Sequence, residues 1–354
     1  MQTHFVDAGR RFECLARNAW IDARQQGDVD AISTRAGREI GPEPKNVFSS
    51  QNRSGSLTKS RHSTCTLRSV MTVTDSVDIL MITYRRPHYT RLTLERLLAT
   101  CNENMRVWVW HNGDHAETLE VVRGFEGHPR LHRFHHCPEN LRLRAPTNWL
   151  FSESRADFVS KIDDDRMMPF GWAETLVTAM QDEPRFGVLS CWHFQEEDYD
   201  PVLAAPKMQT FGRHQILRNM WVAGSGFLLR RTCVEQAGLL RDNEFGFSAY
   251  CTRIALAGNI VGWYWPPVRQ LHLDDPREPL TAIKSDEDLL ATLPLSAIRN
   301  GVRTRADWIA RLKRSALEVQ SASIDPRYYS PWRRKVRNGI ARITRALRLA
   351  RLNS

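Results

Sequence analysis

Three consecutive carboxylates, Asp163-Asp164-Asp165, are the residues of this sequence best placed to do chemistry. They directly follow Asp157–Ile162, a short segment that reads as a buried strand. Carboxylates held this close repel one another, so a cation is needed to compensate them. Mg²⁺ and Mn²⁺ accept carboxylate oxygens and leave room for phosphate oxygens. The triplet is therefore a candidate cation site, and a solvated acidic turn ahead of the next helix is the alternative.

The segments around the triplet alternate between strand and helix patterns. This alternation predicts a doubly wound α/β sheet, whose ligands bind beyond the carboxyl ends of the strands. The second half is less regular, and its part from 276 to 325 has a helical pattern. The expected strands are Val77–Thr83, Val107–Trp110, Leu131–His135, Asp157–Ile162, Val188–Cys191, Val222–Leu229 and Ile260–Trp265. The first expected helix opens at Pro87, and the second runs through Thr118 to Phe125. Three more cover Asn148–Ser154, Arg231–Ala237 and Ser248–Ala257.

The positive charge of the chain is concentrated near its C-terminus. The 354 residues carry 50 Lys+Arg and 40 Asp+Glu, a net charge of +10. Residues 326–354 contribute +9, residues 1–70 contribute +4, and the part from 71 to 325 is −3. A nucleic-acid partner is not expected, because the globular part shows no basic stripe.

Seven scattered cysteines without any CxxC pair indicate a reducing compartment. The N-terminus lacks the apolar core of a signal peptide, and no stretch approaches the ~20 apolar residues of a spanning helix. We expect a cytoplasmic protein, or one on the inner face of a membrane. Residues 1–70 are poor in large apolar side chains, which predicts a disordered extension or a misread start site.

Five segments in order resemble family 2 glycosyltransferases, which have the GT-A fold. The resemblance covers about residues 75–275. It implies a mixed sheet with a Rossmann-like nucleotide-binding half, an acceptor half and, here, a C-terminal helical extension. It also implies transfer of a sugar, with inversion, from a nucleotide-diphosphate donor to an acceptor hydroxyl, assisted by Mn²⁺ or Mg²⁺. The segments are Val77–Leu98, Trp110–Asp114, Glu139–Asn148, Ile162–Trp172 and Val222–Leu240.

Several residues are candidates for holding the donor. Thr83 and Tyr84 end the first strand, where a base and ribose pocket is expected, and the guanidinium of Arg86 suits a diphosphate. Tyr84 could equally be a packed aromatic, and Arg86 could be solvated. The resemblance implies that Asp163 approaches the ribose and that Asp165 approaches the metal. The other donor-binding candidates are Asn112, Arg142 and Asp164.

His272 is the second metal candidate, because the family often places a histidine after the last strand that meets the metal or the diphosphate. A structural or surface histidine is the alternative. Trp221 and Gly224 are candidates for the sugar or acceptor, since an indole can stack on a sugar ring and a glycine permits close approach. Core packing and a tight strand crossing are the simpler explanations.

The general base is the weakest point of the resemblance. The family usually carries a Glu-Asp pair ahead of a helix that contains an arginine, and the acceptor hydroxyl needs such a base. Here Phe247, Ser248 and Ala249 occupy that stretch. Glu244 and Asp242 are the nearest acids, and both could also be ordinary loop carboxylates.

The basic tail, Trp332–Leu352, has apolar residues at helical spacing and arginines on its other faces. It predicts an amphipathic helix on an anionic membrane surface, with a helix docked on the catalytic domain as the alternative. The expected divisions are 1–70, a glycosyltransferase domain at 71–275, a helical extension at 276–325 and the basic helix at 326–354. We expect a role in surface polysaccharide or glycolipid synthesis, with a glycan or glycolipid acceptor. The alternatives are a degenerate nucleotide- or glycan-binding protein and, less favoured, a sugar nucleotidyltransferase.

Overall fold

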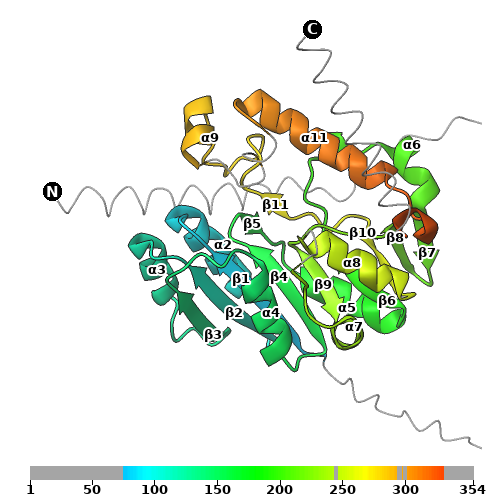
Figure 1. Ribbon diagram of the computed structural model, residues 1–354, viewed down its shortest axis with the longest axis horizontal. Helices are drawn as coiled ribbons and strands as arrows, with labels where there is room; N and C mark the ends of the chain where they lie inside the picture. Colours follow the sequence, from blue (N-terminus) through cyan, green and yellow to red (C-terminus); the bar gives the residue numbers. More distant parts are fainter. Residues whose placement is uncertain (1–74, 243–245, 293–296, 298–300, 331–354) are drawn as a thin grey trace, which may run out of the picture. The chain divides into compact units, whose positions relative to one another are not determined.

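The computed structural model describes residues 75–242, 246–292, 297 and 301–330. Within these residues a nine-stranded mixed sheet forms the centre, with helices on both faces (Figure 1). Its strand order is β3-β2-β1-β4-β9-β6-β10-β8-β7. The strands are β1 (Val77–Thr83), β2 (Met105–Asn112), β3 (Leu131–Cys137), β4 (Phe158–Asp163), β6 (Phe186–Ser190), β7 (Met208–Phe211), β8 (His214–Asn219), β9 (Phe227–Arg230) and β10 (Ile260–Trp265).

The sheet has a parallel half and a mixed half. Strands β3, β2, β1 and β4 are mutually parallel, so their carboxyl ends meet at one edge. Strand β9 runs antiparallel between β4 and β6, while β6 and β10 are parallel to each other. The hairpin β7–β8 extends the sheet antiparallel to β10. This topology confirms the predicted doubly wound mixed sheet.

Each face of the sheet has its own hydrophobic core, because successive side chains of a strand point to opposite faces. Ile79 and Met81 of β1 belong to the core beneath helices α2 (Pro87–Ala99), α3 (Ala116–Arg123) and α5 (Trp172–Asp182). Leu80 and Ile82 belong to the core beneath helices α4 (Arg144–Glu153), α7 (Arg231–Ala237) and α8 (Gly246–Leu256). The near-continuous apolar run of β1 is what burial on both faces requires.

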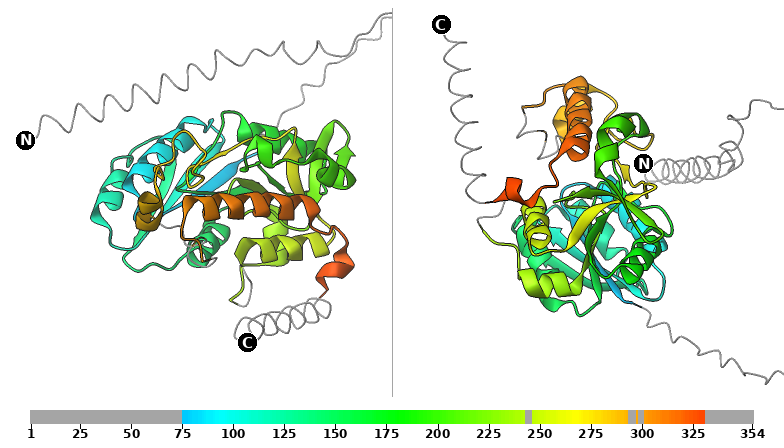
Figure 2. Two further views of the ribbon diagram at one scale, coloured as in Figure 1. Left: turned by 90° about the horizontal axis from the view of Figure 1, so that it is seen from above. Right: turned by 90° about the vertical axis from the view of Figure 1, so that its right-hand side faces the viewer.

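The C-terminal extension contributes to the sheet's core. It contains α9 (Asp286–Thr292), α11 (Arg305–Ser321) and the 3₁₀ turn η3 (Pro326–Tyr329). Ala316 and Val319 of α11 join the core on the α4 face, whereas its Trp308 and Leu312 pack in a smaller separate cluster. Figure 2 shows α11 along one side of the sheet, and contacts place it beside α6 (Pro201–Ala204).

The predicted bounds of β1, α7 and β10 are confirmed. The expected strand Val222–Leu229 is wrong in its first half, because only Phe227–Arg230 pairs as β9. Gly226, at φ +71°, leaves the extended conformation just before it. The predictions for 1–70, Glu244 and Trp332–Leu352 lie outside the described residues. Within the described residues, no helix is long and apolar enough to cross a membrane.

Candidate active site

The acidic triplet lies at the carboxyl end of β4, where a short second sheet brings a distant segment to it. Strand β5 (Arg166–Met167) pairs antiparallel with β11 (Leu271–His272). In this register His272 lies opposite Arg166, and the Leu273 amide donates to the Asp165 carbonyl at 2.8 Å. Two β-residues on each strand therefore fix the position of His272 relative to Asp165.

Asp165, His272 and Asp274 form a candidate metal centre. One ligand atom from each lies within 4.8 Å of the other two, and His272 Nε2 is 3.6 Å from Asp165 Oδ2. His272 Nδ1 and Asp274 Oδ1 are buried and have no hydrogen-bond partner among the described residues. Two carboxylates and an imidazole are a donor set that Mn²⁺ accepts. The residues therefore fit a divalent cation.

Arg86 supplies a positive charge to this cluster. Its Nη2 donates to Asp274 Oδ2 at 2.9 Å, and its Nη1 lies 3.7 Å from Asp165 Oδ2 and 4.0 Å from Asp164 Oδ1. The side chain of Arg86 is only 17% exposed, so little water screens these pairs. Arg86, which the sequence predicted to bind the donor diphosphate, thus pairs with the carboxylates of the cluster in this structure.

Burial and charge pull the carboxyl groups in opposite directions. Burial raises the pKa of Asp164 and of Asp274 to about 7, even though Arg86 favours their ionised forms. Burial also disfavours ionised Asp165, yet Arg166, His272 and Arg86 together hold its pKa well below the usual range. Burial, followed by the charge of Arg166, lowers the pKa of His272, which favours the neutral imidazole that binds metals.

The end of β1 forms the floor of the expected donor pocket. The Tyr84 amide donates to Asp164 Oδ2 at 3.1 Å, which ties the turn after β1 to the triplet. The Tyr84 ring lies against Gly113, where an added Cβ would come within 3.1 Å of it. Thr83 is fully buried, and its hydroxyl pairs with His111 Nδ1 at 2.9 Å. Thr83 thus holds the end of β2 next to β1.

Asn112 holds the loop between β3 and α4. Its Oδ1 accepts from the Leu141 amide at 3.1 Å and from Trp110 Nε1 at 3.0 Å, while its Nδ2 donates to the Arg142 carbonyl at 2.9 Å. Arg142 has a φ of +60°, in the left-handed region. The structure brings both donor candidates together, with Asn112 as the anchor of the loop that carries Arg142.

Asp163 is the most exposed carboxylate of the triplet, at 31%. Its carboxylate pairs with Lys161, and its amide donates to Ser225 Oγ at 2.9 Å. Next to Ser225, a Cβ on Gly226 would lie 2.0 Å from the buried side chain of Gln270. Packing therefore requires the absence of a side chain at Gly226, while the role of Gly224 toward sugar or acceptor stays a prediction.

The acceptor candidates line the neighbouring segment. Trp221 is half-buried and packs against the core on the α4 face. A Cβ on Gly224 would meet the Cβ of Phe247 at 3.4 Å, an ordinary contact. Neither placement tests a contact with sugar or acceptor.

An aromatic ring occupies the start of α8, where the family usually places acids. Phe247 stacks on Phe227 with ring centroids 3.9 Å apart and an interplanar angle of 18°. The Asp242 side chain is 96% exposed, and its Oδ1 accepts from Arg144 Nη1 at 2.5 Å. Because Glu244 lies outside the described residues, Asp242 is the one base candidate that the structure places.

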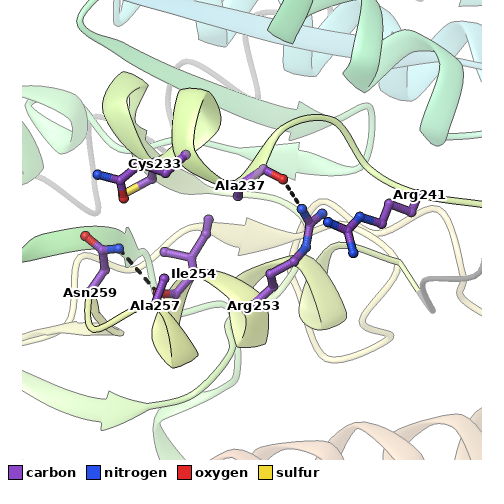
Figure 3. Close-up of a pocket in the computed structure, with 8 residues that line it drawn as sticks. Cys233, Ala237, Arg241, Arg253, Ile254, Ala257 and Asn259 are labelled. Atoms are coloured by element: carbon purple, nitrogen blue, oxygen red, sulfur yellow. Dashed lines mark hydrogen bonds between the residues drawn. The ribbon is translucent and has the colours of Figure 1, made fainter. Parts of the chain in front are cut away.

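The arginine of the α8 segment has a structural partner. Arg253 donates to the carbonyls of Ala237 and, at 3.1 Å, Leu239 (Figure 3). It therefore caps the end of α7 and holds the turn that follows. Arg253 and Arg241 line a cavity of about 100 Å³ between α7 and α8, separate from the residues around Asp165 (Figure 3).

Sequence reasoning missed Asp274 as a partner of the cluster and Lys161 as the partner of Asp163. Asp274 lies in the turn after β11, so strand alternation did not mark it as a partner of His272. Nothing in the sequence indicated that Lys161 pairs with Asp163, because a single lysine can interrupt the apolar pattern of a strand without any such role.

Comparison with known proteins identifies the class. Residues 78–236 match the family described as Glycosyl transferase family 2, so this segment is a family 2 glycosyltransferase domain. Together with the mixed sheet, the match identifies the GT-A fold. No curated protein sequence matches the chain.

Solved structures of glycosyltransferases are similar to the chain. One is the mannosyltransferase PcManGT from Pyrobaculum calidifontis in complex with GDP-Man and Mn²⁺, at 19% identity and a TM-score of 0.48 over 71% of this chain and 74% of that one. Another is S. aureus TarS 1-349, at 10% identity and a TM-score of 0.44 over 68% and 81%. GalNAc-T7 with UDP, GalNAc and Mn²⁺ matches at 10% identity and a TM-score of 0.45 over 56% and 44%.

Proposed function

We propose that this protein transfers a sugar, with inversion, from a nucleotide-diphosphate sugar to an acceptor hydroxyl, with Mn²⁺ or Mg²⁺ bound at Asp165, His272 and Asp274. We propose further that it acts in surface polysaccharide or glycolipid synthesis, in the cytoplasm on the inner face of a membrane. The observation that carries the proposal is the buried cluster at the carboxyl end of β4, in which His272 Nδ1 and Asp274 Oδ1 have no hydrogen-bond partner among the described residues.

The chain's own residues divide the work of binding the donor. Asp163 is partly exposed and pairs with Lys161, and its carboxylate accepts hydrogen bonds from the ribose hydroxyls. Tyr84, fixed by its amide to Asp164, bounds the base pocket. Arg86, already next to the carboxylates, is placed to neutralise the donor diphosphate.

A divalent cation at the cluster would neutralise the diphosphate leaving group, which is the chemistry it supplies to such transfers. Its ligands would be Asp165, His272 and Asp274. The low pKa of Asp165 and the neutral form favoured at His272 keep both ready to bind a metal.

Inversion requires a base opposite the leaving group, because the acceptor hydroxyl loses its proton as it attacks. We propose Glu244 or Asp242 for this role. Asp242 lies on the turn after α7, where its exposed carboxylate accepts from Arg144.

A thermal-shift panel tests the proposal directly. Nucleotide diphosphates and their sugars are added to the full chain with and without Mn²⁺. A metal-dependent rise in melting temperature with one nucleotide, followed by hydrolysis or transfer of the matching sugar nucleotide, supports the proposal. If no nucleotide raises the melting temperature in the presence of Mn²⁺, the proposed function is wrong.

The second candidate function is a nucleotide- or glycan-binding protein without catalysis. The stacked Phe247 at the start of α8 favours it, because this ring stands where a base would be expected. Metal-dependent nucleotide binding without hydrolysis or transfer, across a panel of acceptors, would support this alternative over the enzyme.

A further inference from the structure

Two loops beside the donor pocket expose leucines and arginines together. The first lies between β3 and α4, and the second follows α7. Leu141, Leu143 and Leu239 are 40%, 54% and 44% exposed. The arginines that alternate with or follow them are also exposed, and they are Arg142, Arg144 and Arg241. We call Leu141–Arg144 together with Leu239–Arg241 the leucine–arginine surface.

The two loops are tied into one surface by side chains. Asn148 Nδ2 donates to the Leu240 carbonyl at 3.0 Å, and the Leu240 amide donates to Asn148 Oδ1 at 2.9 Å. Arg144 Nη1 donates to Asp242 Oδ1 at 2.5 Å. Both contacts join the first turns of α4 to the loop after α7, so the two exposed segments are held next to each other.

The backbone of this surface is firmly held although its leucines face water. Asn112 binds both the Leu141 amide and the Arg142 carbonyl. In the second loop, Tyr250 donates to the Gly238 carbonyl at 2.9 Å, and Arg253 donates to the Leu239 carbonyl. The leucines are therefore exposed by a defined loop structure and not by fraying of a chain end.

The first loop also stores backbone strain. Arg142 adopts φ +60°, which costs a residue with a side chain on the order of 1 kcal/mol. Its amide donates to Asn140 Oδ1 at 2.9 Å, which together with Asn112 maintains the conformation. Such strain persists where the surroundings enforce a particular geometry, and here that geometry separates two exposed leucines by an arginine.

We propose that the leucine–arginine surface docks on an anionic lipid bilayer. Leucine side chains gain free energy by leaving water for the boundary of the acyl chains, and guanidinium groups pair with lipid phosphates. Because leucines and arginines alternate along the loop, both kinds of side chain would enter the bilayer interface at the same depth. Among the described residues next to the surface, Asp242 pairs with Arg144, and the exposed Glu139 precedes Leu141 by two residues. The three arginines outnumber these two acids, so this part of the surface is positive.

This contact would set the orientation of the site. Because Asn112 lies at the end of β2 and also anchors Leu141 and Arg142, docking places the donor pocket beside the bilayer. The surface is separate in sequence from the segment Trp332–Leu352, for which a basic helix is predicted. Stable attachment to a membrane takes two signals, and this surface would be a second one.

Vesicle binding by the full-length chain tests the proposal. The vesicles contain phosphatidylcholine with phosphatidylglycerol, or phosphatidylcholine alone. The double variant Leu141→Ser/Leu143→Ser should bind the mixed vesicles roughly tenfold more weakly. The matched control is Leu290→Ser on α9, which removes a leucine that is 52% exposed and should leave binding unchanged. Arg142→Gln should weaken binding about fivefold, and Arg91→Gln on α2 controls for the lost charge.

Hydrogen exchange resolved by peptide separates this surface from the tail. Mixed vesicles should slow exchange in peptides covering 139–144 and 237–242. Protection confined to 331–354, or a double variant that binds as tightly as Leu290→Ser, would overturn the proposal. Protection that grows with protein concentration in the absence of vesicles would assign the surface to a second copy of the chain, which also overturns it. The test involves no sugar transfer, so it stands apart from the proposed function.

Discussion

The guanidinium of Arg86 donates to the carboxylate of Asp274 across 2.9 Å, although 188 residues separate the two in the chain. Asp274 is also one of the three residues of the candidate metal centre. A divalent cation bound there would therefore share its carboxylates with an arginine. Because like charges repel, the position of Arg86 and the occupancy of the metal centre must depend on each other.

Replacing Arg86 by Gln should raise the affinity for Mn²⁺ in the absence of nucleotide by about tenfold, since a nearby positive charge is removed. Electron paramagnetic resonance of free Mn²⁺ measures this without any activity assay. The measurement is best made above pH 7, where Asp164 and Asp274 are ionised. Arg91→Gln loses the same charge one turn further along α2 and should leave the affinity unchanged. Weaker Mn²⁺ binding by Arg86→Gln would contradict the shared-carboxylate picture.

The metal ligands should separate from the ribose-facing carboxylate by their effects. His272→Ala and Asp165→Ala should each weaken Mn²⁺ binding and abolish the metal-dependent part of the thermal shift with nucleotide. Asp163→Asn should weaken nucleotide binding while Mn²⁺ alone binds as in the unmodified chain. Calorimetric titration with Mn²⁺ and then with nucleotide distinguishes the two patterns. Unchanged Mn²⁺ affinity in His272→Ala would remove His272 from the centre.

Gly226 should be the glycine that the site least tolerates losing. A Cβ there would lie 2.0–2.4 Å from atoms of the Gln270 side chain, which is buried and donates to the Cys191 carbonyl. Gly226→Ala should therefore lower the free energy of unfolding by about 2–4 kcal/mol. Gly212→Ala is the control, because its φ of +57° is also positive but its Cβ would meet nothing within 4 Å. That control should cost about 1 kcal/mol. Denaturant unfolding measures both, and equal losses would show that crowding by Gln270 is unimportant.

Local patterns predicted the parallel half of the sheet well. The apolar run of β1 and the turn residues after β2 are local sequence patterns. They were therefore enough to predict the strands and the position of their carboxyl ends at one edge of the sheet. The hairpin β7–β8 was not predicted, because β7 has four residues, none of them fully buried, and β8 has polar residues at its buried ends. Its pairing depends on β10, which lies more than 40 residues further along the chain.

The site was predictable where it is continuous in sequence and obscure where it is assembled by the fold. The triplet could be predicted as a site because its three carboxylates are adjacent in the sequence. The partnership of Asp274 with Arg86 depends on the register of β11 against β5, two strands of two residues each, which no local pattern encodes. Likewise, Asn112 was expected at the donor, but its hydrogen bonds to the backbone of Leu141 and Arg142 required the loop to be seen in place.

The two base candidates should differ in their effect on transfer. Asp242→Asn should change kcat less than tenfold, because the carboxylate is 96% exposed and tied to Arg144. Glu244→Gln should lower kcat by about 100-fold or more while leaving donor affinity unchanged, as loss of a general base does. Transfer and donor binding are measured on the same preparations. If both variants retain full kcat, neither residue is the base.

Buried Lys207 should make folding depend on pH in the alkaline range. Its amine donates to Asn219 Oδ1 at 2.8 Å and to the Val319 carbonyl at 2.5 Å, so it ties α11 to β8. Burial lowers its pKa to about 8 in the folded chain, while an unfolded lysine titrates near 10.5. Between these values the unfolded chain holds a proton that the folded chain has lost, so stability rises with pH.

Lys207→Met should lack this rise. Relative to the variant, the unmodified chain should gain on the order of 2 kcal/mol in its free energy of unfolding as pH increases from about 8 to about 10.5. The neutral amine keeps two N–H groups for its two acceptors, so the hydrogen bonds survive deprotonation. Denaturant unfolding of both proteins across this range provides the comparison, which cancels the titration of the other lysines and tyrosines. If the difference in the free energy of unfolding between the unmodified chain and Lys207→Met stays constant with pH, Lys207 keeps an ordinary pKa and remains protonated next to α11.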